Sequence, residues 1–128
     1  MRRVAAVSKI ALLLLACDAT RVISVPLPST TKPSSACALS VFQASRDLRD
    51  AGLNRDGDVY AILVLPAGLT SPEPRPEVSI YATRPNFGTP GHALELRWLG
   101  ATGTRDYNDF ANGVLSRLAE SLAAKCAE

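Results

Sequence analysis

Three short segments in the middle of the chain constrain its fold more than any other feature. Glu77–Thr83 and Ala93–Leu99 alternate apolar and polar residues, as strands of a half-buried antiparallel sheet do. Val59–Leu65 is apolar on both faces and ends at a proline. Loops rich in proline and glycine separate the three segments, so we expect a three-stranded antiparallel meander.

Two amphipathic helices are expected to flank these strands. The first runs from a capping residue, Ser35, to Ala51, because apolar residues recur at spacings of three and four, and Gly52 ends it. The second begins near Asp106 and carries one apolar stripe toward the C-terminus. A short β-branched segment, Thr20–Val25, is either an additional edge strand or the start of a tether.

The predicted order of elements is (β)αβββα. It indicates an α+β fold, a two-layer sandwich in which two helices cover one face of a three- or four-stranded, mainly antiparallel sheet. This order resembles that of small envelope-assembly lipoproteins, such as the lipopolysaccharide-assembly auxiliary lipoprotein and the auxiliary lipoproteins of lipid-transport ABC systems. The resemblance is one of architecture and carries over no residues.

The N-terminus has the layout of an export signal. Basic residues within positions 1–9 precede an uninterrupted apolar run, Ile10–Ala16, which is too short to span a bilayer as a mature helix. The run closes with Leu-Leu-Ala-Cys, ending at Cys17, and this resembles the lipobox of bacterial lipoproteins. In that family the cysteine is lipidated, the chain is cut before it, and it becomes the mature N-terminus.

The resemblance implies a signal peptide over residues 1–16 and a lipidated Cys17. By composition, residues 17–35 form a Pro/Ser/Thr-rich tether that precedes a small α+β domain over residues 36–128, although the Pro/Ser/Thr-rich part is equally well a loop that joins a strand to a helix. Asp18 resembles the inner-membrane retention signal of the enterobacterial sorting system. The expected location is the cell envelope, anchored by lipid and facing the periplasm, with the inner membrane slightly favoured over the outer. The alternative is an ordinary signal peptide that releases a soluble exported protein.

Cys37 and Cys126 are the two cysteines left for a bridge, and an oxidising compartment favours a disulfide between them. The predicted meander argues against that pairing. Its first and third strands run the same way, so helices joined to them by short loops run parallel and hold the cysteines at opposite ends. A disulfide requires Cα atoms within about 7 Å. The sequence leaves the pairing open.

Patterns for catalysis, metals and cofactors are weak. The single histidine, His92, lies in a Gly/Pro-rich segment without a nucleophile motif, and together with Cys37 and Cys126 it lacks the paired spacing of a zinc site. We expect no cofactor, and a net charge of +2 without a basic cluster gives no sign of nucleic-acid binding. The sequence thus predicts a binding or assembly protein rather than an enzyme; the alternative is a soluble inhibitor or a small hydrolase that uses His92.

The doubly apolar segment predicts where binding takes place. If helices cover one face of the sheet, the other face presents Tyr60, Ile62 and Val64, with Tyr81 and Leu99 from the following strands. Contiguous exposed apolar surface marks a site for a partner, a membrane or a ligand. We expect this face to bind an envelope protein, a second copy of the chain or a lipid-like chain, unless the linker or a long loop covers it.

Overall fold

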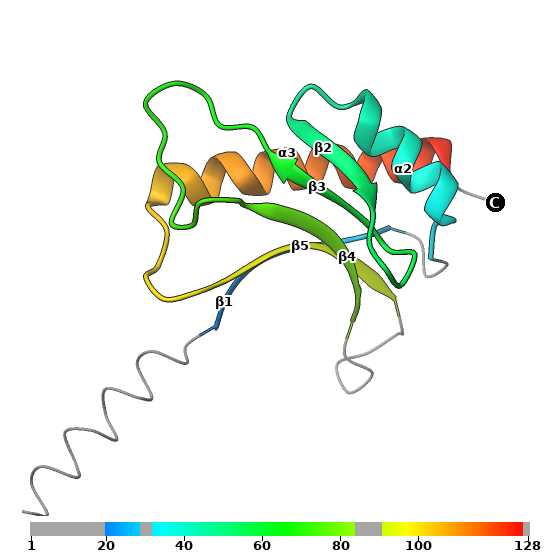
Figure 1. The fold of residues 1–128 in the computed structure, drawn as a ribbon, viewed down its shortest axis with the longest axis horizontal. Helices are drawn as coiled ribbons and strands as arrows, with labels where there is room; N and C mark the ends of the chain where they lie inside the picture. Colours follow the sequence, from blue (N-terminus) through cyan, green and yellow to red (C-terminus); the bar gives the residue numbers. More distant parts are fainter. Residues whose placement is uncertain (1–19, 29–31, 84–90, 127–128) are drawn as a thin grey trace, which may run out of the picture.

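The computed structural model describes residues 20–28, 32–83 and 91–126. In this part of the chain, two helices cover one face of a five-stranded antiparallel sheet (Figure 1). The strands are β1 (Thr20–Pro26), β2 (Leu48–Leu53), β3 (Val59–Leu63), β4 (Glu77–Ala82) and β5 (His92–Leu99), and the helices are α2 (Ser35–Ala44) and α3 (Arg105–Lys125). The spatial order is β1-β5-β4-β3-β2. The predicted α+β class and mainly antiparallel sheet are confirmed, whereas the strand count is higher than predicted.

The largest departure from the prediction is β2. The helix expected to reach Ala51 ends at Ala44, and Leu48–Leu53 forms an edge strand against β3. Because β3 is buried on both faces, its outer backbone groups need hydrogen-bond partners, and a helix over the same residues would not supply them. The pairing with β3 is irregular in the middle of β2, where Asp50 has a φ of 54°. This irregularity is a β-bulge, which lets the polar residues of β2 pair with β3.

β1 is a full strand of the sheet. It pairs with β5 along its whole length, from Thr20 opposite Leu99 to Pro26 opposite Ala93. The sequence allows Thr20–Val25 to be either an edge strand or the start of a tether, and the structure forms a strand there, so the fold includes β1 and does not begin at residue 36. What remains of the Pro/Ser/Thr-rich segment connects β1 to α2.

One row of residues shows how the sheet builds the core. Ile23, Leu96, Val78 and Ala61 are paired in turn across β1, β5, β4 and β3, and the last three are 0% exposed. These side chains belong to the same apolar core as the inner faces of α2 and α3. α3 packs on β1 and β5, and α2 packs on β2 and β3.

The added strand also sets the direction of the helices. β3 and β5 run in the same direction, because each is antiparallel to β4. α2 is antiparallel to β2, the strand that follows it, so α2 runs in the direction of β3. α3 follows β5 and runs antiparallel to it. The two helices are therefore antiparallel, and the start of α2 meets the end of α3 (Figure 1). Cys37 and Cys126 form a disulfide there, with Cα atoms 5.8 Å apart. The prediction of parallel helices is wrong because the predicted meander lacks β2.

Side-chain hydroxyls begin both helices. Ser34 Oγ and Thr104 Oγ1 each accept a hydrogen bond from the backbone N–H three residues further on, at 3.2 and 3.1 Å. These bonds satisfy donors that have no partner within the helix. The predicted caps, Ser35 and Asp106, lie inside the first turns instead.

Candidate functional site

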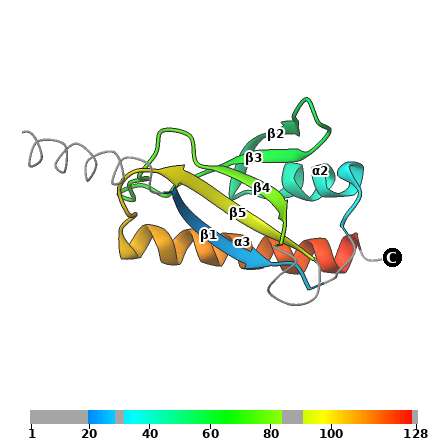
Figure 2. The same ribbon diagram turned by 90° about the horizontal axis from the view of Figure 1, so that it is seen from below.

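The sheet face opposite the helices forms the candidate binding surface, which we call the open face. The register runs one row of it across all five strands: Ser24, Glu95, Ser79, Tyr60 and Gly52 are paired in turn. In Figure 2, β1 and β5 lie in front of α3, so their open face is turned toward the viewer. Within the described part of the chain, α2 and α3 both belong to the core on the other face.

The four residues predicted for this surface differ in position and exposure. Tyr60 and Tyr81 lie on the open face and are half-buried. Ile62 lies on the same face but is only 1% exposed, and its cross-strand neighbours are long charged residues of β2 and β4. Val64 is 38% exposed and follows the end of β3. The prediction that Ile62 is exposed is therefore wrong.

A polar cluster around Glu95 occupies the centre of the open face. Arg97 Nε donates to Glu95 Oε1 at 2.6 Å, and Ser24 Oγ donates to Glu95 Oε2 at 3.2 Å. The Arg97 guanidinium lies 3.7 Å from the centre of the Tyr81 ring, within the range of a cation–π contact. The Glu95 side chain is 12% exposed and that of Arg97 is 45% exposed. The cluster thus fixes an arginine and a tyrosine, two side chains enriched at protein interfaces, at the surface.

Exposed apolar side chains lie where β1 begins and β5 ends. Val22 is 48% exposed and is paired with Arg97, and Leu99 is 67% exposed and is paired with Thr20. Both stand on the open face by the alternation of their strands. The sequence indicates Leu99 for this face. It does not indicate Val22, because it leaves open whether Thr20–Val25 is a strand or a tether.

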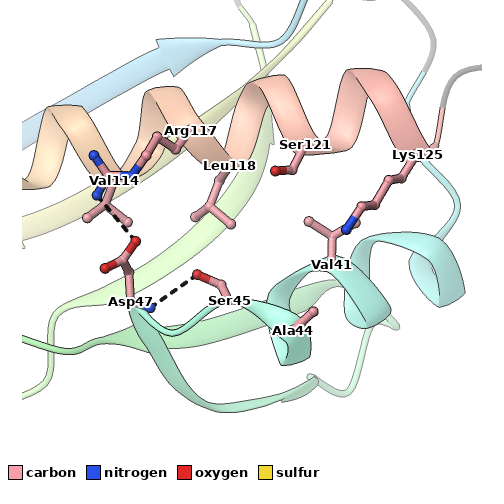
Figure 3. A pocket seen from close by; sticks show the side chains of 9 residues that line it. All are labelled: Val41, Ala44, Ser45, Asp47, Val114, Arg117, Leu118, Ser121 and Lys125. Carbon is pink, nitrogen blue, oxygen red and sulfur yellow. Dashed lines mark hydrogen bonds and ion pairs between the residues drawn. The ribbon is translucent and has the colours of Figure 1, made fainter.

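A groove lies between α2 and α3 (Figure 3). Its volume is about 190 Å³, and its lining combines apolar side chains from both helices with Arg117, Lys125 and Asp47. An ion pair of 3.2 Å between Arg117 and Asp47 spans one end. Ligand pockets are usually larger, at about 300–1,000 Å³. We therefore interpret the groove as part of the interface between the two helices.

Two side chains near the start of α3, one of them on the β3–β4 loop, have buried oxygen atoms. Glu73 Oε1 and the Tyr107 hydroxyl are buried without a hydrogen-bond partner of good geometry among the described residues. Burial, and next the charge of Glu77, raise the pKa of Glu73 from 4.5 to about 7. Burial also raises the pKa of Tyr107. Perturbed acids often mark functional sites, but these two do not line the groove between α2 and α3, so we expect them to make stability depend on pH. Glu73 could not be identified from the sequence, because its environment depends on tertiary packing.

The remaining predicted groups do not assemble into a reactive centre within the described residues. His92 begins β5, and its Nδ1 is buried without a hydrogen-bond partner in that part of the chain. Cys37 and Cys126 are joined to each other, and residues 20–28, 32–83 and 91–126 hold no group of three or more His, Cys, Asp or Glu side chains placed to bind a metal ion.

Cys17 and Asp18 lie outside the described residues. Among the helices that the structure describes, none is both long enough and apolar enough to cross a bilayer. Comparison of the chain with models of known protein families, with curated proteins and with solved structures finds no match.

Proposed function

We propose that the chain is a bacterial envelope lipoprotein, anchored by a lipid on Cys17 and facing the periplasm, that binds a protein partner through the open face. The observation that carries the binding role is the open face itself. It presents Arg97 stacked on Tyr81, and a second half-buried tyrosine, Tyr60, lies on the neighbouring strand β3. Arginine and tyrosine are both enriched in protein interfaces.

The lipid anchor is supported by two features. The lipobox-like residues end at Cys17, and this is the one cysteine of the three that does not take part in the bridge between Cys37 and Cys126. A disulfide of that kind suits an oxidising compartment such as the periplasm. Asp18 favours retention at the inner membrane over transfer to the outer membrane.

Fractionation of cells that express the full chain tests the anchor. We expect the wild-type protein in the membrane fraction and Cys17→Ser in the soluble fraction or as an uncut precursor, because serine cannot carry the thioether lipid. Ser40→Ala, an exposed change on α2, serves as the control, since it leaves both Cys17 and the bridge between Cys37 and Cys126 intact. A processed wild-type protein that is wholly soluble would support the alternative, a soluble exported domain.

Photo-crosslinking in cells tests the binding role. A photoreactive phenylalanine at position 81 keeps the aromatic ring of Tyr81 on the open face, and the same group at Glu120, an exposed site on α3, is the control. We expect a crosslinked product of defined mass at position 81 and none at position 120. A product of twice the chain mass identifies a second copy of the chain, and any other mass an envelope protein. Equal products at both sites, or none at position 81, would contradict a binding role for the open face.

A further inference from the structure

We propose that the domain rests on the bilayer through the end at which β1 begins, with Leu99 and Val22 at the lipid surface. We call this the membrane end, and it comprises Thr20, Arg21, Val22, Leu99, Ala101 and Arg105. The inference rests on the proposed function, because it requires a lipid on Cys17. It goes further by assigning which surface of the domain meets the phospholipid.

The length of the chain between the lipid and the fold limits where the domain can sit. Thr20 already belongs to β1, so only Asp18 and Ala19 separate it from Cys17. Three residue steps span at most about 11 Å, whatever their conformation. Directly opposed residues of an antiparallel pair lie about 5 Å apart, so Leu99, which faces Thr20, lies within roughly 16 Å of Cys17. A lipid at Cys17 therefore brings the membrane end against the headgroups.

The side chains at this end suit such a contact. Leu99 and Val22 are large apolar residues that are 67% and 48% exposed, and they stand on neighbouring strands. Exposed apolar side chains at this level would be buried at the interface between headgroups and acyl chains. A lipid on Cys17 thus accounts for the exposure of Leu99, which is paired with Thr20, the first residue of β1.

Two arginines border the apolar residues at this end. Arg21 donates through Nε to the carbonyl oxygen of Gly100 at 3.3 Å and is itself exposed. The Arg105 side chain is 93% exposed, and it lies 3.9 Å from Asp109 in the next turn. The guanidinium groups can reach lipid phosphates while their stems cover apolar surface. The apolar side chains supply the surface that is buried, and the arginines add attraction to anionic headgroups.

This orientation leaves the rest of the molecule accessible. β1 runs away from the membrane end, and the bridge between Cys37 and Cys126 lies where α2 begins and α3 ends, at the far end of α3 from the membrane (Figure 1). The open face stands at an angle to the bilayer rather than against it. A partner in the periplasm can therefore reach Tyr81 while Leu99 stays on the lipid.

Spin labels on the lipidated full chain test the proposal. Leu99→Cys introduces the only free thiol, because the Cys17 sulfur carries the lipid and the other two cysteines are bridged. Leu53→Cys is the matched control, since Leu53 is 47% exposed and ends β2 at the opposite end of the sheet. Each labelled protein is placed in vesicles of phosphatidylethanolamine and phosphatidylglycerol. The readout is the ratio of label collisions with oxygen to collisions with a water-soluble nickel chelate, and an intact mass of the same sample reports the lipid.

We expect a mass with lipid on Cys17 and a collision ratio several-fold higher at position 99 than at position 53. A label at Val22→Cys should give a collision ratio close to that at position 99. If Leu99→Cys folds poorly, Val22→Cys replaces it in the measurement. Lipid in the mass with a low ratio at both positions overturns the membrane contact but not the anchor. A label at 99 that neither reagent reaches means that a protein covers this end, which also overturns it. A mass without lipid overturns the anchor and the contact together.

Discussion

Removal of the disulfide between Cys37 and Cys126 is expected to cost the domain a large part of its stability. The bridge joins residues 89 positions apart in the sequence. In the chain-entropy description, closing a loop of that length is worth about 4.6 kcal/mol at 25 °C, because the bridge restricts the unfolded chain. Small domains are stable by only about 5–15 kcal/mol in total. The bridge should therefore account for about a third to nine tenths of that total.

Urea denaturation followed by far-UV circular dichroism measures this loss. The double variant Cys37→Ala, Cys126→Ala avoids an unpaired thiol, and we expect its free energy of unfolding to fall by about 3–5 kcal/mol. Ser40→Ala, an exposed change on the same helix, is the control and should stay within about 0.5 kcal/mol of wild type. A loss below about 1 kcal/mol for the double variant would refute the reasoning, since a formed bridge across so long a loop must restrict the unfolded chain.

Three further changes test separate parts of the structure by the same unfolding assay. The folded-state pKa of Glu73 is raised to about 7, so the folded state keeps a proton that the unfolded chain releases above pH 4.5, and stability should fall as the pH rises from about 4.5 to 7. Glu73→Gln should remove that dependence on pH and raise the free energy of unfolding at pH 8 by about 1–2 kcal/mol, which is less than the full pKa shift implies because solvent screens part of the effect. An unchanged dependence on pH would contradict the raised pKa of Glu73. Leu115→Ala should cost about 2–5 kcal/mol because Leu115 is 0% exposed, whereas Leu99→Ala should change stability by less than about 0.5 kcal/mol, and equal losses would show that Leu99 is buried. Thr104→Ala should cost about 1 kcal/mol by removing the first hydrogen bond of α3, with Thr104→Ser as the variant that retains it.

The strands with a clear local pattern could be predicted from the sequence. Glu77–Thr83 and Ala93–Leu99 alternate cleanly, and the structure forms β4 and β5 there. β2 could not be predicted, because Leu48 and Ala51 fit a helical spacing and the strand exists only by pairing with β3. Tertiary pairing overrode local propensity at this point. The presence of β2 also makes α2 and α3 antiparallel instead of parallel. A prediction without β2 therefore placed Cys37 and Cys126 at opposite ends of the domain, although they form a disulfide.

The candidate site was predictable to a similar degree. Alternation placed Glu95 and Arg97 on the outer face of β5, and the structure puts both on the open face. It could not show that the two pair with each other or that Arg97 stacks on Tyr81, because those contacts depend on how side chains fold over the sheet. Ile62 was expected to be exposed because periodicity reports a face of a strand and not how far its neighbours cover it.

The intact mass of the protein purified from bacterial membranes, with and without reductant, tests the central claim most directly. We predict a chain that begins at Cys17 and carries a diacylglycerol group and an acyl chain, with a gain of two protons when the bridge between Cys37 and Cys126 is reduced. A chain that begins at Thr20 without lipid would contradict the membrane anchor and would make the protein a soluble exported domain.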